Sequence, residues 1–518
     1  MSSSPPLNPA QRQAVHHIDT PLLVLAGAGS GKTRVITHKI AWLIRQCGLS
    51  PSHIAALTFT NKAAREMKAR VSSLLDKGEG RGLRISTFHT LGLDIIRRER
   101  QTLGYREGFS IFDAQDGESL IKELLHRDGE QGDMAKEMLW QISSWKNRTL
   151  TPEAVAASGE HPPVARLYSK YNQHLKAYNA VDFDDLIMLP LQLFRHHREA
   201  LERWQNRIRY LLVDEYQDTN EAQYELVRLL TGVRCALTVV GDDDQSIYTW
   251  RGARPENLAQ LQQDYPSLEV IKLEQNYRSM GRILKVANQL IDNNPHLFPK
   301  RLWSERGYGD PILVVTAADE EDEALKVVSR IIHLQFQQGC KPGECAILYR
   351  GNYQSRPFEK ALREHRIPYQ ISGGTSFFAH SEVKDIISYL RLLNNPDDDA
   401  AFLRVVNTPR REIGAATLEK LGHYATSRGI SLFAAAFELG LKQTLSERAY
   451  ERLNQFVHWL VDIADRARRG DPVAAVRDLI KETDYLSWLN DSVDAAKTVE
   501  RKTANIEELI AWIARMAA

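Results

Sequence analysis

Cysteine is scarce in this 518-residue sequence, which contains four. Four cysteines do not make a disulfide framework in a chain of this length, and Cys340 with Cys345 lacks a second pair at the spacing of a zinc site. We therefore expect four ordinary thiols and neither a disulfide-stapled secreted fold nor a cysteine-based metal site.

Long hydrophobic runs are also missing. No apolar stretch reaches the roughly 18 residues of a membrane-spanning helix, and the N-terminal MSSSPP lacks the charged start and apolar core of a signal peptide. These absences predict a cytoplasmic protein without a membrane partner.

Net charge of either sign is nearly absent, because 67 Lys and Arg oppose 66 Asp and Glu for a net charge of +1. Such a chain has no whole-molecule field that would attract a polyanion, so any nucleic acid must bind in a local groove. Apolar residues make up 43% of the sequence, which is ample for the three or four domains that the length suggests. No internal repeat, low-complexity tract or long flexible linker is found.

Residues 26–33, AGAGSGKT, form the strongest local signal. They follow an apolar run at 21–25 that predicts a buried parallel strand, and they precede a helical periodicity at 34–44. In that context the glycines let successive N–H groups face an anion at a helix N-terminus. Lys32 would reach the terminal phosphates and Thr33 would ligate Mg²⁺. The alternative, a glycine-rich turn without a ligand, does not account for the strand and helix on either side.

Further strands are predicted at 54–60, 85–90, 210–213, 236–240 and 270–273. With a helix beginning at residue 61, they favour βαβ units with ligands at the carboxyl ends of a parallel sheet. Upstream, Asn8 could cap a short helix that begins at Pro9, in which Gln11 is, on pattern alone, a solvated residue.

Two carboxylates follow the predicted strand at 210–213. Asp214 would hold Mg²⁺ and Glu215 would orient and deprotonate the attacking water. Many strands end in acidic turns, so this pair indicates a nucleotide site only in combination with the phosphate loop upstream.

Polar and aromatic residues follow the next two strands. Gln245 would sit near the γ-phosphate, and Tyr248, Trp250 and Arg251 after it suggest a stacking platform for single-stranded bases. Aromatics packed on a buried face remain the alternative. After residue 273, Tyr277 could stack on a base and Arg278 could stabilise phosphate charge.

The rest of the chain is mainly helical in pattern. Residues 92–199 predict a helical insertion, in which the acids of VDFDDLI at 181–187 would form a helix N-terminal turn. A second α/β unit is predicted from strands at 312–315 and 346–349 around a helix at 323–336. Past residue 378 the pattern is helical to the end.

Eight motifs together resemble the Rep, UvrD and PcrA group of superfamily one DNA helicases, most closely its Rep branch. They are LNPAQRQAV, AGAGSGKT, TFTNKAAREM, STFHTLG, VDFDDLI, LLVDEYQDTN, VGDDDQSIYTWRGA and LEQNYRS. The resemblance covers nearly the whole chain, and Ala26, where the general phosphate-loop pattern has Gly, is what this group uses.

The resemblance implies an α/β fold with a RecA-like P-loop motor domain, a helical insertion, a partial second RecA-like domain and a partial helical subdomain. The implied boundaries are 1–90 with 200–279, then 91–199, 280–377 and 378–518. Family members continue with a segment resembling LHxxKGLE and a TRA-like arginine motif, which are not found here. We therefore expect the chain to stop inside the helical subdomain.

The resemblance also assigns residues. Gln11 would read the adenine, Tyr277 would stack on it, and Gln245 and Arg278 would sense the γ-phosphate. The implied catalytic residues are Lys32, Asp214, Glu215, Gln245 and Arg278, with Thr33 and Asp214 as metal ligands. The implied nucleotide-binding residues are Gln11, Ala26, Gly27, Ala28, Gly29, Ser30, Gly31, Lys32, Thr33, Arg34, Tyr277 and Arg278. The implied DNA-binding residues are Phe59, Thr87, His89, Phe183, Tyr248, Trp250 and Arg251.

The implied function is an ATP- and Mg²⁺-dependent 3′ to 5′ single-stranded DNA translocase or helicase of the bacterial nucleoid, acting in replication or repair. Single-stranded DNA and single/double-strand junctions would be its substrates, with replication or repair proteins as partners and self-association left open. Two alternatives remain. One is a truncated nucleotide-dependent single-strand binding module with little unwinding. The other is the motor part of a helicase-nuclease, although no nuclease-like acidic constellation follows the motor in this sequence.

Overall fold

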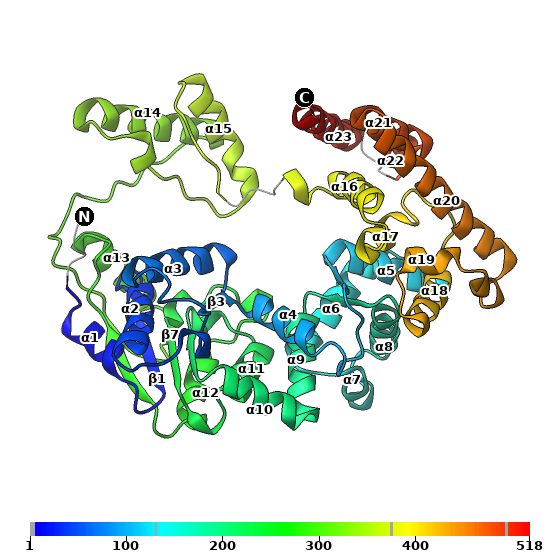
Figure 1. Cartoon of the computed structure of the whole chain (residues 1–518). Helices are drawn as coiled ribbons and strands as arrows, with labels where there is room; N and C mark the ends of the chain where they lie inside the picture. Colours follow the sequence, from blue (N-terminus) through cyan, green and yellow to red (C-terminus); the bar gives the residue numbers. More distant parts are fainter. Residues whose placement is uncertain (1–5, 130–131, 373–376, 493–495, 518) are drawn as a thin grey trace.

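The N-terminal part of the computed structural model is built on a six-stranded parallel sheet with strand order β3-β2-β6-β7-β1-β8 (Figure 1). The structure describes residues 6–129, 132–372, 377–492 and 496–517. The strands are β1 (Leu22–Ala26), β2 (Ile54–Thr58), β3 (Arg84–Thr87), β6 (Tyr210–Val213), β7 (Leu237–Gly241) and β8 (Glu269–Leu273). The predicted parallel sheet is confirmed.

Both faces of this sheet are covered, which is why its strands are continuous apolar runs. Along β1, Leu23 and Leu25 enter one hydrophobic core, whereas Leu22 and Val24 enter the other. Helices α2 (Lys32–Arg45) and α3 (Asn61–Leu74) pack on the second face. The first face carries α4 (Phe88–Arg98), α9 (Asp185–His196), α10 (Arg198–Arg207), α11 (Glu221–Thr231) and α12 (Asn257–Asp264). The carboxyl ends of the strands are thereby left to form a site.

Two local expectations in this domain are corrected. The strand predicted at 85–90 ends at Thr87, because the Thr87 hydroxyl accepts from the Thr90 N–H at 3.2 Å and caps α4. Helix α1 (Pro9–His16) begins after Asn8 as predicted. Gln11, however, is fully buried rather than solvated, and its Nε2 donates to the Ser30 carbonyl at 2.8 Å.

The helical insertion contains α5 (Ala114–Arg127), α6 (Ala135–Asn147), α7 (Pro152–Ser158) and α8 (Pro162–Ala177). It also contains a small parallel sheet, β4 (Ser110–Phe112) with β5 (Ala180–Asp182), which sequence reasoning missed. Three-residue strands are too short to produce an alternating pattern that would stand out.

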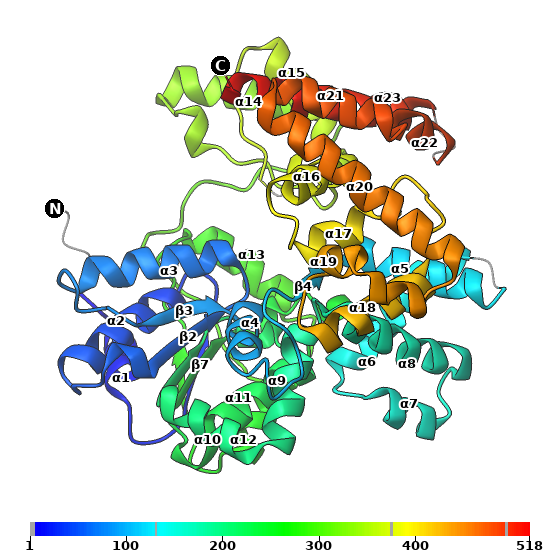
Figure 2. The ribbon, with the colours of Figure 1, turned by 45° about the vertical axis from the view of Figure 1, so that its right-hand side comes forward.

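The C-terminal helices share a hydrophobic core with this insertion (Figures 1 and 2). They are α16 (Ser381–Asn394), α17 (Asp399–Val405), α18 (Ala415–Arg428), α19 (Leu432–Phe437), α20 (Glu447–Arg469), α21 (Pro472–Glu482), α22 (Tyr485–Asp491) and α23 (Ala496–Ala517). Of them, α17 and α18 lie directly against the insertion. One hydrophobic core runs through both groups, and the Tyr178 hydroxyl donates to the Ala415 carbonyl at 3.2 Å across their contact. The predicted helical C-terminal region is confirmed, although the two regions share a core.

The predicted strands of the second α/β unit are wrong. Residues 312–315 and 346–349 have no strand conformation in the structure, and Val314 and Leu348 are 91% and 93% exposed. A strand needs a hydrogen-bonded neighbour, and these segments pair with no other described segment. Between them, the predicted helix is present as α14 (Glu320–Gln338), which buries a small core against α15 (Ser355–Glu364). Helix α13 (Gly281–Ile291) precedes them.

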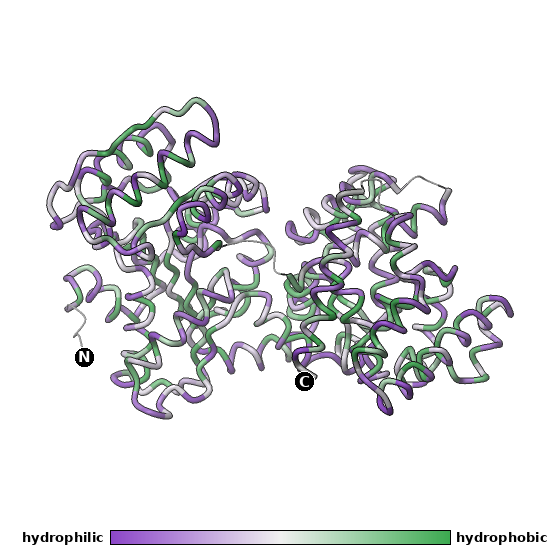
Figure 3. The backbone as a smooth tube through the Cα atoms, turned by 90° about the horizontal axis from the view of Figure 1, so that it is seen from above, coloured by the Kyte–Doolittle hydropathy of each residue, from purple (hydrophilic) through white to green (hydrophobic). Residues whose placement is uncertain are grey.

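Hydrophobic segments run through the inside of both halves of the chain when it is seen from above (Figure 3). Among the residues that the structure describes, no helix is both long and apolar enough to cross a membrane. All four cysteines are free thiols, as expected.

Candidate nucleotide site and nucleic-acid interface

The phosphate loop is the turn from β1 into α2. Gly29 and Gly31 have φ angles of +72° and +92°, which a side chain rarely adopts. A Cβ atom on Gly31 would also lie 2.7 Å from Gln11 Nε2, and one on Gly29 would lie 2.6 Å from Asn276 Nδ2. The Ser30 hydroxyl donates to the Gly27 carbonyl at 2.7 Å and closes the turn. This is a backbone cradle at a helix N-terminus, which favours a phosphate group.

The acidic pair after β6 lies opposite this cradle. Lys32 Nζ donates to Glu215 Oε2 at 2.7 Å. Burial and then the charge of Glu215 raise the pKa of Asp214 to about 7. Burial pushes the pKa of Glu215 upward, but Lys32 and a hydrogen bond from Gln217 together lower it below its usual value. The pKa values of the two neighbouring carboxyls are therefore shifted in opposite directions.

A divalent cation fits this corner chemically. Asp214 is a buried carboxyl whose pKa is raised by burial and by the charge of Glu215, and Thr33 lies in the first turn of α2 beside the loop. Carboxylate and hydroxyl oxygens are the ligands that Mg²⁺ prefers. Arg34 follows in the same turn of α2.

The segment after β8 closes over the loop. The Tyr277 N–H donates to the Gly29 carbonyl at 2.9 Å, and Asn276 Nδ2 donates to the Ala28 carbonyl at 2.5 Å. Asn8 Nδ2 donates to the Tyr277 hydroxyl at 2.8 Å, which brings Tyr277 to the end of α1 that carries Gln11. A Cβ on Gly29 would lie 2.7 Å from that of Arg278. The structure thus brings the predicted adenine and phosphate residues together.

A cluster of three aspartates follows β7. The carboxylate oxygens of Asp242, Asp243 and Asp244 lie within 4.8 Å of one another, a spacing that could hold a metal ion. Lys300 Nζ fills the cluster instead, at 2.8, 2.5 and 2.8 Å from the three carboxylates. Gln245 Nε2 donates to Asp242, so the lysine also fixes the strand end from which Gln245 projects.

The predicted DNA residues form two groups of rings. In the first, Phe59 stacks on Tyr248 with 5.6 Å between centroids, and Tyr248 lies 6.4 Å from Trp250. The Arg251 guanidinium lies 4.4 Å from the Trp250 ring. Trp250 is 59% exposed, so the alternative of a buried aromatic face is wrong for this residue.

In the second group, His89 stacks on Phe183 at 4.0 Å, with 25° between the rings. Phe183 is 56% exposed, and burial lowers the pKa of His89 to about 4, so the histidine ring is neutral at physiological pH. Thr87 is buried, and its hydroxyl is used in the cap of α4. Exposed rings that are already held in place are suited to stacking on unpaired bases.

Family models match both halves of the chain. Residues 7–266 match the UvrD/REP helicase N-terminal domain, and residues 271–517 match the UvrD-like helicase C-terminal domain. The chain belongs to the UvrD/REP helicase family.

Curated relatives agree with that assignment. The chain is 58% identical to ATP-dependent DNA helicase Rep of Escherichia coli K12, over 98% of this chain and 76% of the relative. It is 44% identical to Rep of Buchnera aphidicola subsp. Schizaphis graminum, over 98% and 78%, respectively. Against ATP-dependent DNA helicase PcrA of Bacillus subtilis 168 the identity is 42%, over 97% and 68%. The chain therefore spans about three quarters of the Escherichia coli relative.

Three residues of this helicase's site were missed by sequence reasoning. Gln217 donates to Glu215 at 3.0 Å and accepts from the Asp242 N–H at 3.0 Å, so it joins the ends of β6 and β7. Lys300 pairs with the aspartates after β7, and Asn276 donates to the phosphate loop. Both partners are distant in sequence. Gln217 and Asn276 lie inside LLVDEYQDTN and LEQNYRS, which is a signal for their role, whereas Lys300 has no local signal.

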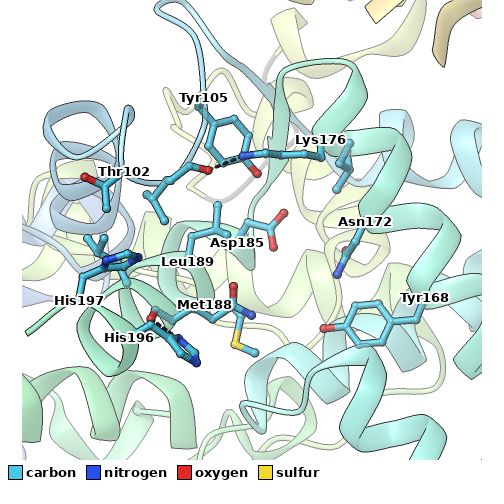
Figure 4. Close-up of a pocket in the computed structure, with 14 residues that line it drawn as sticks. Thr102, Tyr105, Tyr168, Asn172, Lys176, Asp185, Met188, Leu189, His196 and His197 are labelled. Carbon is cyan, nitrogen blue, oxygen red and sulfur yellow. Dashed lines mark hydrogen bonds between the residues drawn. The ribbon is translucent and has the colours of Figure 1, made fainter. Parts of the chain in front are cut away.

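A cavity of about 380 Å³ lies elsewhere in the helicase, between α8, α9 and the segment after α4 (Figure 4). Tyr168 and Asn172 line one side of it, and Lys176 reaches over the Tyr105 ring with 3.4 Å to the centroid. No predicted site residue lines this cavity, although Asp185 on its wall is two residues from Phe183.

Proposed function

We propose that this chain, an ATP-dependent DNA helicase of the Rep type, moves along one DNA strand in the 3′ to 5′ direction. The observation that carries the proposal is the loop after β7. Hydrogen bonds connect its Gln245 through Asp242 and Gln217 to Glu215, and within six residues the loop presents the exposed Trp250 ring. One short loop thus connects the proposed catalytic carboxylate to the proposed DNA platform.

Within this proposal the residues divide the chemistry of hydrolysis. Lys32 and the loop N–H groups bind the phosphates, and Glu215, whose pKa is lowered, accepts a proton from the attacking water. Thr33 and Asp214 would hold Mg²⁺, which when bound neutralises phosphate charge. Gln245 and Arg278 lie on loops that can respond to the γ-phosphate, and Gln11 and Tyr277 would hold the adenine.

The proposed motor consists of residues 1–90 with 200–279 as the first RecA-like domain and 280–377 as part of a second one. Residues 91–199 and 378–518 are the two helical subdomains. ATP between the motor domains would favour their closed arrangement, because only there does the γ-phosphate contact both. Hydrolysis removes that differential contact and lets the domains part.

The proposed substrates are single-stranded DNA and single/double-strand junctions. Stacking on Phe183, Tyr248 and Trp250 would contribute roughly 1–3 kcal/mol per base without sequence preference, which suits a translocase. The proposal also includes action in replication or repair at the bacterial nucleoid, with proteins of those processes as partners. Self-association is a further outcome that sedimentation of the DNA complex would test.

The testing experiment is the steady-state ATPase rate with and without an oligo(dT) strand, using Lys32→Ala as the blank. Strong stimulation that Lys32→Ala abolishes, with unwinding of a duplex that has a 3′ tail but not of one with a 5′ tail, is the expected result. Nucleotide and DNA binding without stimulated turnover would instead favour the single-strand binding module.

A further inference from the structure

Asn147, the last residue of α6, uses its side-chain amide to join two distant segments. Its Nδ2 donates to Asp184 Oδ1 at 3.0 Å and to the Ser143 carbonyl at 2.8 Å. Its Oδ1 accepts from Asn220 Nδ2 at 2.5 Å. One amide therefore links the helical insertion to the loop that begins at the proposed base.

On one side, a short hydrogen-bonded turn connects Asn220 to Glu215. Between them the backbone is closed by hydrogen bonds from Asp218 N–H to the Glu215 carbonyl at 3.0 Å and from Thr219 N–H to the Tyr216 carbonyl at 3.1 Å. Asn220 is 8% exposed and caps α11. A shift of Asn220 is therefore transmitted along a tight turn to the base.

On the other side, Asp184 is the neighbour of Phe183, the exposed ring that stacks on His89. Because Asp184 and Phe183 are adjacent, a base that stacks on the ring and moves it also moves the carboxylate that Asn147 holds.

Lys146, next to Asn147, makes this turn rigid. Its buried ammonium lies 2.6 Å from Asp182 and 2.7 Å from Asp185. The Asp182 N–H donates to Asp185 Oδ2 at 3.1 Å, and the Asp185 N–H donates to Asp182 Oδ1 at 2.8 Å. The acids that were expected to form only a helix N-terminal turn are thus a closed ionic unit that carries Phe183. A rigid unit passes a displacement on rather than absorbing it.

The first group of rings, which contains Tyr248 and Trp250, also lies next to Asn147. A Cβ on Gly252 would lie 4.0 Å from the Cβ of Asn147, and Gly252 ends the turn that carries Trp250 and Arg251. Both proposed DNA-contacting groups therefore lie beside the same residue, Asn147.

We propose that Asn147 is a positioning residue that couples the presence of single-stranded DNA at Phe183 and Trp250 to the placement of Glu215. This inference rests on the proposed DNA contacts. A hydrogen bond weakens steeply with distance and angle, so the three-point contact of Asn147 has one favoured arrangement of the two segments. Alanine at this position lets the segments move independently.

The test measures equilibrium coupling and does not require turnover. The dissociation constant of a fluorescent, non-hydrolysable ATP analogue is titrated with and without saturating oligo(dT). For the unmodified chain we expect oligo(dT) to tighten analogue binding by a factor of about 5 to 150, the usual range of coupling between two sites. In Asn147→Ala that factor falls to about 2 or less, while each ligand alone binds within about threefold of the unmodified chain.

Asn220→Ser tests the same bond from its other end. Serine keeps the cap of α11 but lacks the amide donor, so folding is retained. We expect the same loss of coupling, and no further loss in the double variant, because both changes remove one shared contact. Asn490→Ala, at an exposed asparagine of α22, is the control and keeps full coupling.

Three results would overturn the proposal. The first is full coupling in Asn147→Ala or in Asn220→Ser. The second is a loss of DNA affinity in Asn147→Ala as large as the loss of coupling, which would make Asn147 part of the DNA site. The third is the absence of coupling in the unmodified chain. Failure of the proposed function itself would appear separately, as weak binding of the analogue or of oligo(dT) alone.

Discussion

Lys300 Nζ lies 2.8 Å from Asp242 Oδ1, and Asp242 in turn accepts a hydrogen bond from Gln245. The lysine comes from the segment after α13, its side chain is only 3% exposed, and it also pairs with Asp243 and Asp244. Burial lowers the pKa of Lys300, but the carboxylates more than compensate and raise it. Lys300 therefore stays charged and holds the end of β7 in place.

Lys300→Met is expected to weaken both folding and turnover. It leaves the aspartates without their cation, which by analogy with broken buried ion pairs costs about 3–5 kcal/mol of unfolding free energy. Displacement of Asp242, which holds Gln245, should also lower ATP turnover about tenfold or more, since small misplacements near reacting groups are costly. Urea unfolding and steady-state ATPase assays measure the two effects. Lys285→Met, at an exposed lysine of α13, is the control, and equal behaviour of the two variants would contradict the prediction.

Glu215→Gln should separate binding from hydrolysis. The amide cannot accept the proton of the attacking water, so we expect turnover to fall by about 10² to 10⁴. Binding of a non-hydrolysable ATP analogue should remain, because Lys32 is then relieved of its 2.7 Å ion pair and is free for phosphate. Lys32→Ala should lose analogue affinity as well. Normal turnover in Glu215→Gln would remove Glu215 from the proposed role.

The buried strands could be predicted from sequence because they depend on local composition. The apolar runs of β1 and β6 were located within one residue, and the residues after them, Lys32 with Asp214 and Glu215, came together because parallel strands end at one edge. The strand predicted at 312–315 is wrong for the same reason. Its apolar composition favours a strand, but pairing with a neighbour decides whether one forms.

Contacts between distant segments left no such local signal. Nothing near Gln11 shows that its side chain is buried against Ser30, because Ser30 lies 19 residues further along the chain. Likewise, Lys300 and Asn147 look like ordinary polar residues until folding places Asp242 and Asn220 beside them. Tertiary placement, rather than residue type, gives these side chains their roles.

Phe183→Ala should weaken binding to oligo(dT) by roughly 1–3 kcal/mol, because one exposed stacking surface is lost. The loss should be similar for oligo(dA), since stacking tolerates any base. Fluorescence anisotropy titrations at one fixed salt concentration measure both affinities. Phe336→Ala removes an 87%-exposed phenylalanine from α14 and is the matched control. Equal affinities for the two variants would argue against a DNA contact at Phe183.

Gly422→Val should separate the C-terminal helices from the helical insertion. A Cβ at Gly422 would lie 2.1 Å from the Ala177 carbonyl oxygen, so α18 cannot stay docked on α8. Overpacking of this kind typically costs about 1–3 kcal/mol or more. Limited proteolysis should then cut between the two regions faster. Gly343→Val, where nothing lies within 4 Å of the added Cβ, should keep the unmodified cleavage rate; equal rates for both variants would show that the contact is dispensable.

Lys39 should make stability depend on pH in the alkaline range. Its side chain donates to the Ala14 and His17 carbonyls at the end of α1, and burial lowers its pKa from 10.5 to about 7. Between these values the unfolded chain binds more protons than the folded one, so the unfolding free energy contributed by Lys39 rises with pH, by at most about 1.4 kcal/mol per unit. Below pH 7 both states are protonated and this contribution is constant. Lys39→Met removes the rise, so urea unfolding of both proteins from pH 7 to 9.5 should give a difference that grows in favour of the unmodified chain. A constant difference across that range would mean that Lys39 is not titrating as its burial requires.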